Sequence, residues 1–276
     1  MRIVFILFIF FSGSIKCDSI SILFLGDTHF GENYQYDARF NRGVNVIEEY
    51  GYDYFFENVK EILSSTDISV CNLETPLLSV PETISSPKPY VHWSDPFKTP
   101  EYLVKYNIKF VSLGNNHVFD RGVSGFKETT GSLEKFGIKY FGAGSNSTVG
   151  AAPLIINKNN VKFVIFGGFE YRAGYDTSYD FYADSVNAGV NTLDTITLNE
   201  QIFKYRKEFP SAKIIIYPHW GSNYREVKLR QISFAHSWIN AGADLIIGHG
   251  AHTVQEIEMY NGKWIIYNIG NFIFNS

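Results

Sequence analysis

Apolar residues along the chain fall into short runs of the length and composition of buried strands. The stretches between several of these runs repeat their apolar residues at helical spacing, as Phe55, Val59, Ile62 and Leu63 do. Strands are predicted over residues 20–25, 67–73, 108–113, 138–141, 153–157, 161–167, 212–217, 242–247, 254–260 and 263–268. Helices are predicted over residues 54–65, 100–106, 122–136, 195–209 and 227–240, with a long loop over 32–50.

The alternation of strand and helix predicts an α/β protein with a mostly parallel central sheet covered by helices on both faces. Two strand pairs depart from this alternation. Lys158-Asn159-Asn160 and Asn261-Gly262 are turn sequences between adjacent strands and predict hairpins.

Several predicted strands end in polar residues that packing does not require. The candidates are Asp27 and His29, Glu74, Asn116 and His117 with Asp120 after them, His219, and His249 with His252. In parallel sheets the carboxyl ends of the strands border the ligand site, so these side chains are expected to share one rim. Taken alone, Asn116 and His117 fit an ordinary loop equally well, and Asp27 and His29 fit a turn aspartate with an unrelated surface histidine better. The common position of all these residues favours the shared site. His92, isolated in a Pro- and Ser-rich loop, is interpreted as a surface histidine.

Composition narrows the class of protein. The chain has 276 residues, enough for one large domain or two small ones, and 45% of them are hydrophobic. That fraction indicates a packed globular core. The formal charge is −4 without a basic block, so nucleic-acid binding is not expected.

The N-terminus has the pattern of a targeting segment. Arg2 precedes an unbroken apolar run over residues 3–11, followed by small residues at 12–14. The run is shorter than the roughly 20 residues of a membrane span, and a secretory signal over 1–17 fits it better. The mature domain would then be 18–276, outside the cytoplasm. Cys17 raises the alternative of a lipoprotein, against which Lys16 argues, and Cys71 is predicted to be a buried apolar residue.

The strand-end residues together offer carboxylate, amide and imidazole ligands without a thiolate. Such a set suits Mn²⁺, Fe or Zn²⁺ and does not choose among them. It exceeds one tetrahedral zinc site but suffices for two cations. Two metal ions about 3.5–4 Å apart can bind the attacking and the leaving oxygens of a phosphoryl displacement.

From about Ser19 to the C-terminus, the chain resembles the CapA/PgsA family of capsule and poly-γ-glutamate synthesis proteins. The landmarks are Gly26-Asp27, Asn72-Leu73-Glu74-Thr75-Pro76, Asn115-Asn116-His117 with Asp120, His219-Trp220-Gly221, Gly248-His249 with His252 and Gln255, and Tyr267-Asn268-Ile269-Gly270-Asn271-Phe272. The resemblance implies the fold of the calcineurin-like metallophosphoesterases.

The resemblance also implies roles. Asp27, His29 and His252 look like ligands of one metal, and Asn116, His219 and His249 like ligands of the other. Glu74 stands at the position of a bridging carboxylate. His117 matches the histidine that protonates the leaving oxygen, and Asp120 is its expected orienting partner.

The chain departs from the family pattern in four respects. Glu74 is longer than the usual aspartate, which leaves open a part for Asn72, and Val118 replaces the usual acidic neighbour of His117. Gly250-Ala251 stands between His249 and His252 where many members have His-Pro-His. Members also usually continue beyond the Gly-Asn-Phe strand, so the chain is interpreted as a truncated or minimal form.

Two functions share every residue named. One is an exported metal-dependent hydrolase acting on a phosphoester-type bond in surface-polymer synthesis. The other is a non-catalytic accessory protein that binds metal and polymer during assembly or export. Expected partners are a surface polymer or phosphoester substrate and membrane-bound polymer-synthase subunits.

Overall fold

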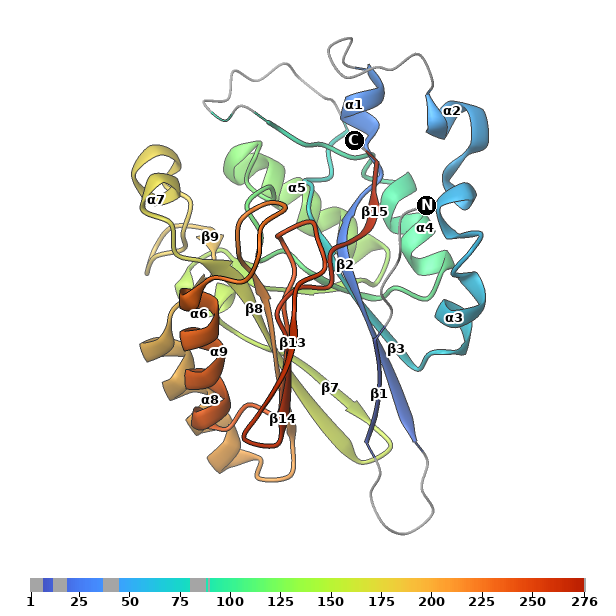
Figure 1. Cartoon of the computed structure of the whole chain (residues 1–276). Coiled ribbons are helices and arrows are strands. Elements are labelled where there is room, and N and C mark those ends of the chain that lie inside the picture. The colour runs from blue at the N-terminus through green and yellow to red at the C-terminus, as the bar shows by residue number, and fades with distance from the viewer. Residues whose placement is uncertain (1–6, 12–18, 37–44, 80–87, 89, 276) are drawn as a thin grey trace.

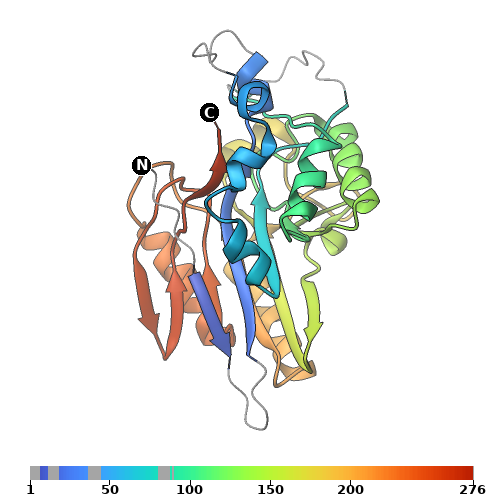
Figure 2. The same cartoon turned by 90° about the vertical axis from the view of Figure 1, so that its right-hand side faces the viewer.

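The computed structural model describes residues 7–11, 19–36, 45–79, 88 and 90–275, and of residues 7–11, 35 and 36 it describes the backbone alone. Two β-sheets pack face to face, and helices cover the outer face of each (Figures 1 and 2). The order of layers is therefore helix, sheet, sheet, helix.

The first sheet has the strand order β1-β2-β3-β4-β5, with β15 also paired to β2. Its strands are β1 (Leu7–Phe11), β2 (Ile20–His29), β3 (Ile68–Leu73), β4 (Phe110–Ser112), β5 (Lys139–Phe141) and β15 (Asn271–Phe274). All pairs are parallel except β1 with β2. In this register Asp27 lies beside Asn72 on one side and Asn271 on the other.

The second sheet has the order β10-β8-β11-β12-β14-β13, with β7 paired to β8. Its strands are β7 (Leu154–Lys158), β8 (Val161–Glu170), β10 (Thr192–Leu193), β11 (Lys213–His219), β12 (Leu245–Ile247), β13 (Ile257–Tyr260) and β14 (Lys263–Ile266). The two predicted hairpins, β7-β8 and β13-β14, are its antiparallel pairs. A separate antiparallel pair joins β6 (Ala143–Gly144) to β9 (Gly189–Val190).

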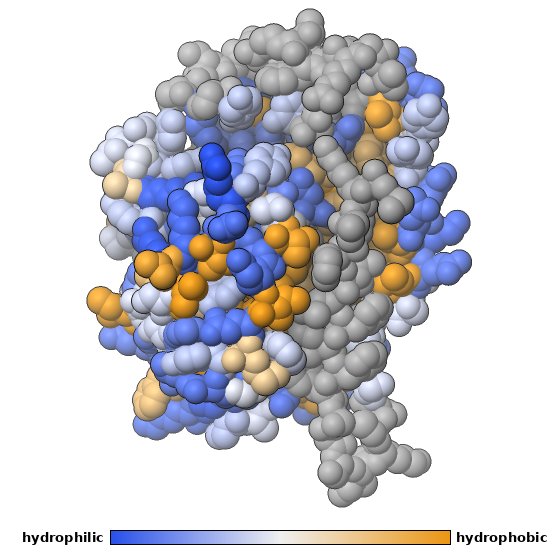
Figure 3. All heavy atoms as spheres, in the orientation of Figure 1, coloured by the Kyte–Doolittle hydropathy of each residue, from blue (hydrophilic) through white to orange (hydrophobic). Residues whose placement is uncertain are grey.

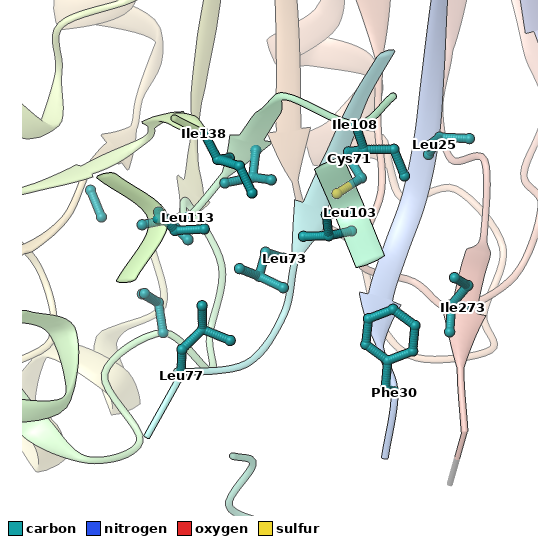
Figure 4. Packing of buried hydrophobic residues seen from close by; sticks show 14 of the residues in the cluster. Leu25, Phe30, Cys71, Leu73, Leu77, Leu103, Ile108, Leu113, Ile138 and Ile273 are labelled. Atoms are coloured by element: carbon teal, nitrogen blue, oxygen red, sulfur yellow. The ribbon is translucent and has the colours of Figure 1, made fainter. Parts of the chain in front are cut away.

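Strand β2 shows how the layers are held. Ile22 and Phe24 point toward the second sheet and pack with residues such as Ile165 of β8. Leu23 and Leu25 alternate with them and pack under the helices. Because both faces are buried, the sequence is apolar at consecutive positions. Figure 4 shows part of the outer core, where Leu25, Cys71, Leu73, Leu103, Ile108 and Leu113 meet.

The helices on the first sheet are α3 (Lys60–Ser65), α4 (Lys98–Lys105) and α5 (Gly122–Lys135), and those on the second are α8 (Thr195–Glu208) and α9 (Leu229–Ala241). Asp194 caps α8 by accepting hydrogen bonds from the backbone N–H groups of Ile196 and Thr197. The shorter helices are α1 (Glu32–Tyr36), α2 (Val46–Tyr50), η1 (Tyr52–Phe56), α6 (Ser147–Gly150) and α7 (Ala173–Tyr179).

The predicted fold class is confirmed, and three details differ. Each sheet carries helices on one face only, because its other face is buried against the second sheet. The expected helix over 54–65 is a 3₁₀ turn followed by α3, and the expected loop over 32–50 contains α1 and α2. Cys71 is fully buried, as predicted.

The predicted secretory signal, residues 1–17, lies mostly outside the described residues. Within it, residues 7–11 form β1, whereas Cys17 and the expected cleavage region before Ser19 lie among the residues that are not described. No helix in the described part of the chain is long and apolar enough to cross a membrane.

Candidate metal centre

Both sheets contribute strand ends to one buried cluster. Asp27 lies near the end of β2, and Glu74 follows β3 directly. His219 is the last residue of β11, and a β-bridge joins it to His249 in the loop after β12. The same loop supplies His252. These five predicted ligands come together because parallel strands end at the same edge of each sheet.

The first group of candidate ligands is Asp27, His219 and His249, whose ligand atoms all lie within 4.8 Å of one another. Nδ1 of His249 lies 3.2 Å from Oδ1 of Asp27 and 3.1 Å from Nδ1 of His219. All three side chains are buried.

The second group is Asp27, Glu74 and His252, and it shares Asp27 with the first. Nδ1 of His252 lies 3.3 Å from Oδ2 of Asp27, and its Nε2 lies 3.8 Å from Oε1 of Glu74. That Glu74 oxygen is also 3.8 Å from Nε2 of His219. Ligands of one cation with bonds of about 2.1 Å stand about 3–4 Å apart, so the spacing in both groups fits metal binding.

Unpartnered polar atoms support the same interpretation. Oε1 of Glu74, Nε2 of His249 and Oδ1 of Asn116 are buried without a hydrogen-bond partner among the described residues. A buried polar atom without a partner is costly. For Oε1 of Glu74, which lies 3.8 Å from Nε2 of both His219 and His252, a bound cation would remove that cost. The two groups are thus candidate metal ligands.

The pKa values of the two carboxyl groups are shifted in opposite directions. Burial favours protonated Asp27, but hydrogen bonds with His249 and His252 outweigh it and hold the pKa of Asp27 well below its usual range. Burial and the neighbouring charge of Asp27 raise the pKa of Glu74 well above its usual value. Burial lowers the pKa of His252, but the carboxylates of Glu74 and Asp27 outweigh it and raise that pKa to about 10.

Asn72 places its amide group between the carboxylates. Its Nδ2 donates to Asp27 Oδ1 at 2.9 Å and, more weakly, to Glu74 Oε2 at 3.4 Å, while its Oδ1 accepts from Asn115. Asn115 is held in turn, because its Oδ1 accepts from the backbone N–H groups of His117 and Val118. Asn72 therefore presents a donor to the centre and acts as a positioning residue in this arrangement.

The C-terminal Gly270-Asn271 segment fixes the other side of Asp27. The carbonyl oxygen of Gly270 accepts from the Asp27 N–H at 3.2 Å and would lie 1.8 Å from a Cβ placed on Gly26. Only glycine fits at position 26 without a shift of the backbone. Oδ1 of Asn271 lies 2.8 Å from Nδ1 of His252. The Gly26-Asp27 motif and the Gly270-Asn271 segment, which are far apart in the sequence, thus lie side by side at the candidate metal centre.

His117 lies beside the cluster and outside both ligand groups. Its Nδ1 lies 2.6 Å from Oδ2 of Asp120, and Lys88 contacts the other oxygen of that carboxylate. Burial, followed by the charge of Lys88, holds the pKa of His117 well below its usual value. The expected pairing of His117 with Asp120 is present, and its orienting role stays a prediction.

The interpretation of His92 as a surface histidine is wrong. Its side chain is buried, with 2% exposure for the residue, and its ring stacks on His117 at 3.6 Å and on His29 at 4.3 Å between centroids. The loop returns over the centre because Ser94 exchanges backbone hydrogen bonds with Pro76 and Leu78. The only hint in the sequence is the apolar setting of Val91 and Trp93.

His29 lies in this stack and belongs to neither ligand group. Neither of its ring nitrogens has a hydrogen-bond partner among the described residues, and burial lowers its pKa to about 4. A neutral imidazole can bind a metal ion through its unprotonated ring nitrogen. The ligand role of His29 stays a prediction.

Comparison with known sequences gives the family. A model of the family described as bacterial capsule synthesis protein PGA_cap matches residues 21–276. The chain belongs to this family. The predicted resemblance is thereby confirmed.

Named relatives agree. The chain is 28% identical over 275 residues to the PGA biosynthesis protein CapA of Bacillus subtilis, covering 99% of this chain and 70% of the relative. It is 28% identical over 235 residues to the capsule biosynthesis protein CapA of Bacillus anthracis, covering 83% of this chain and 56% of the relative. A probable polyglutamine synthesis accessory protein of Mycobacterium tuberculosis is 27% identical over 76% of this chain and 56% of its own. The matches thus leave a substantial part of each of these relatives uncovered.

Solved structures support the fold alone. A hypothetical protein of Thermus thermophilus aligns over 90% of this chain and 75% of its own with a TM-score of 0.53. A novel phosphatase of Mycoplasma pneumoniae aligns over 91% and 72%, also with a TM-score of 0.53. Both share 14% sequence identity with this chain, so the likeness extends to the fold and no further.

Proposed function

We propose that this chain is an exported metal-dependent hydrolase that cleaves a phosphoester-type bond during synthesis of a capsule or poly-γ-glutamate surface polymer. The observation that carries the proposal is the position of Asp27 in two ligand groups at once. A carboxylate with each oxygen facing a different set of ligands is suited to bridge two cations.

The residues of this chain would divide the work. Asp27 would take the bridging position that the resemblance gives to Glu74. Asp27, His219, His249 and Asn116 would hold one ion, and Asp27, Glu74, His252 and His29 the other. Two such ions supply electrostatic stabilisation of the attacking and leaving oxygens of a phosphoryl displacement. Asn72 keeps the carboxylates of Asp27 and Glu74 at their spacing.

His117 would handle the proton of the leaving group. With Nδ1 directed at Asp120, its Nε2 is the atom left for substrate. The lowered pKa of His117 makes the imidazole neutral at pH 7 in the free protein. A negatively charged phosphoester beside the ring raises that pKa, so the binding of substrate itself would charge the acid.

The polymer context comes from the relatives. Proteins named for capsule, PGA and polyglutamine synthesis match this chain, and the family model is described in the same terms. Membrane-bound polymer-synthase subunits are the partners that this context suggests.

Export rests on the N-terminal pattern of Arg2 and the apolar run after it. N-terminal sequencing of exported material should begin between about residues 15 and 19, and an intact Met1 on protein retained in the cytoplasm would contradict it.

A second candidate is a metal- and polymer-binding accessory protein without turnover. The name of the Mycobacterium tuberculosis relative favours it, as does the replacement of the usual His-Pro-His by His249-Gly250-Ala251-His252.

Hydrolysis assays on the purified mature domain separate the two candidates. The domain is loaded with Mn²⁺, Zn²⁺ or Fe²⁺ and assayed on chromogenic phosphoesters and on poly-γ-glutamate. Turnover that disappears in Asp27→Ala supports the hydrolase. Stoichiometric metal binding without turnover of any of these compounds supports the accessory protein.

A further inference from the structure

A second polar surface lies directly beside the metal centre. A cavity of about 310 Å³ is lined by Glu170, Arg172, Ser222, Lys228, Arg230 and Gln231. An adjoining cavity of about 640 Å³ shares Ser222 and Lys228 and adds Tyr224, Arg225 and Glu226. We call the two together the basic groove. In Figure 3 strongly hydrophilic atoms gather on the part of the surface between α7 and the start of α9.

The strand register places this groove at the metal centre. Glu170 ends β8, one residue beyond the partner of His219 on β11. Arg172 donates to the carbonyl oxygen of Gly221, two residues after His219. One end of the groove therefore borders the first ligand group.

Tyr224 connects the other cavity to the second ligand group. Its ring lies 5.9 Å from that of His252, and its backbone N–H donates to the carbonyl oxygen of Ala251 at 2.8 Å. The residue holds a left-handed backbone conformation, φ 58°, which is unfavourable for a tyrosine, and its side chain is 70% exposed. A strained, exposed aromatic ring beside the centre is typical of a surface that contacts a ligand.

Two cations of the groove, Lys228 and Arg230, make contacts with uncharged groups. Nζ of Lys228 donates to the hydroxyl of Ser222, and the guanidinium of Arg230 lies over the ring of Phe234. Neither has a carboxylate partner among the described residues. Basic side chains elsewhere do, as in Lys98–Glu101, Lys105–Asp53 and Lys158–Asp67.

Of the cations lining the groove, Arg172 alone is paired in the described part of the chain. Nε and Nη2 of Arg172 both donate to Oε1 of Glu170, at 2.9 and 2.6 Å, which fixes the guanidinium at the edge of the cavity. The groove therefore combines one fixed cation with Arg225, Lys228 and Arg230, which have no carboxylate partner in the described part of the chain.

We infer that the basic groove binds a stretch of a carboxylate-bearing polymer and leads it to the metal centre. This inference rests on the proposed function, since it adds a polymer-binding surface beside the same site. Arginine forks pair with carboxylates through two parallel hydrogen bonds, and side chains spaced along a groove suit an anion that repeats along a chain. The net charge of −4 would otherwise repel such a polymer, so a local cationic surface is required.

Binding of γ-linked glutamate oligomers tests the inference on the metal-loaded protein. The double variant Lys228→Gln/Arg230→Gln should bind roughly tenfold more weakly, with a smaller salt dependence, because two ion pairs at an exposed site are lost. Its metal content and its turnover of a small phosphoester should stay unchanged. The control is Lys127→Gln/Lys207→Gln, which removes the same charge from exposed positions on α5 and α8 and should bind as the parent does.

Equal binding by the groove variant and the parent would overturn the inference, as would equal weakening by the control. Tighter binding of polyphosphate of matched charge through Lys228 and Arg230 would overturn the choice of carboxylate. Failure of the groove inference can be distinguished from failure of the proposed hydrolysis. Oligomer binding lost in the groove variant but kept in Asp27→Ala supports the groove even if no turnover is found.

Discussion

Nδ1 of His117 lies 2.6 Å from Oδ2 of Asp120, and the same oxygen accepts the backbone N–H of His92 at 2.7 Å. Lys88 contacts the other carboxylate oxygen. A single buried carboxylate thus holds the proposed proton donor and the loop that covers it. The arrangement leaves Nε2 of His117 as the ring nitrogen available beside the metal ligands.

The substitution Asp120→Asn should lower kcat roughly tenfold to a hundredfold, because His117 would lose the acceptor that sets its tautomer and orientation. Metal content should stay at the parent level, since Asp120 is in neither ligand group. Single-turnover kinetics and metal analysis of the variant check this. An unchanged kcat would show that Asp120 does not orient His117.

Gly26→Ala should damage the metal centre without touching a ligand. A Cβ at this position would meet the Gly270 carbonyl oxygen at 1.8 Å, so β2 and the Gly270-Asn271 segment must move apart. Asp27 is part of β2, and His252 contacts Asn271. Both the metal affinity and the melting temperature of the variant should therefore fall. The control is Gly131→Ala in α5, where nothing lies within 4 Å of the added Cβ and a stabilisation of about 0.5–1 kcal/mol is expected. A Gly26→Ala protein with parental metal affinity and melting temperature would contradict the described approach of the two segments.

Asp244 predicts part of the acid sensitivity of the fold. Burial raises its pKa, but Lys263, the Ile214 N–H and Arg206 outweigh it and hold the pKa below its usual value. The lowered folded pKa means that the stabilisation is fully present above the unfolded pKa of about 3.9 and is lost as pH falls through the folded pKa.

Asp244→Asn should therefore be less stable at pH 7, by about 1–3 kcal/mol, and the difference from the parent should shrink below about pH 4. Denaturant unfolding at a series of pH values measures this. Glu208→Gln, an exposed change on α8, is the control and should follow the parent at every pH. A difference between Asp244→Asn and the parent that does not depend on pH would count against the ion pairs.

The sequence predicted the part of the site that follows from strand direction. Five predicted ligands stand near the carboxyl end of a parallel strand or in the loop that follows it: Asp27, Glu74, His219, His249 and His252. Local apolar runs suffice to locate such strand ends. His92 could not be found in this way, because its position depends on backbone hydrogen bonds that return its loop to Pro76 and Leu78.

The number of sheets was also beyond local patterns. Ile22 and Leu23 are both buried, one against the second sheet and one against helices. An apolar run is the same whichever element covers each face, so the α/β class could be predicted without the pairing of two sheets. The same pattern of ligands would serve a hydrolytic site and a site that only binds metal. Hydrolysis therefore could not be predicted from that pattern alone.

In the proposed site, Asp27 and its histidines hold metal while His117 performs chemistry. His249 belongs to a ligand group and His117 does not, although both are buried histidines beyond strand ends. His236 supplies a control, because its Nε2 contacts Glu258 on the outer side of the second sheet, away from the centre.

Metal content and turnover of His117→Ala, His249→Ala and His236→Ala, measured side by side, test this division of roles most directly. His249→Ala should lose bound metal and the stability that metal confers, and His236→Ala should keep both. His117→Ala should keep its metal and lose turnover about 10²–10⁴-fold. Loss of metal from His117→Ala to the same extent as from His249→Ala, or full turnover without His117, would contradict the assignment.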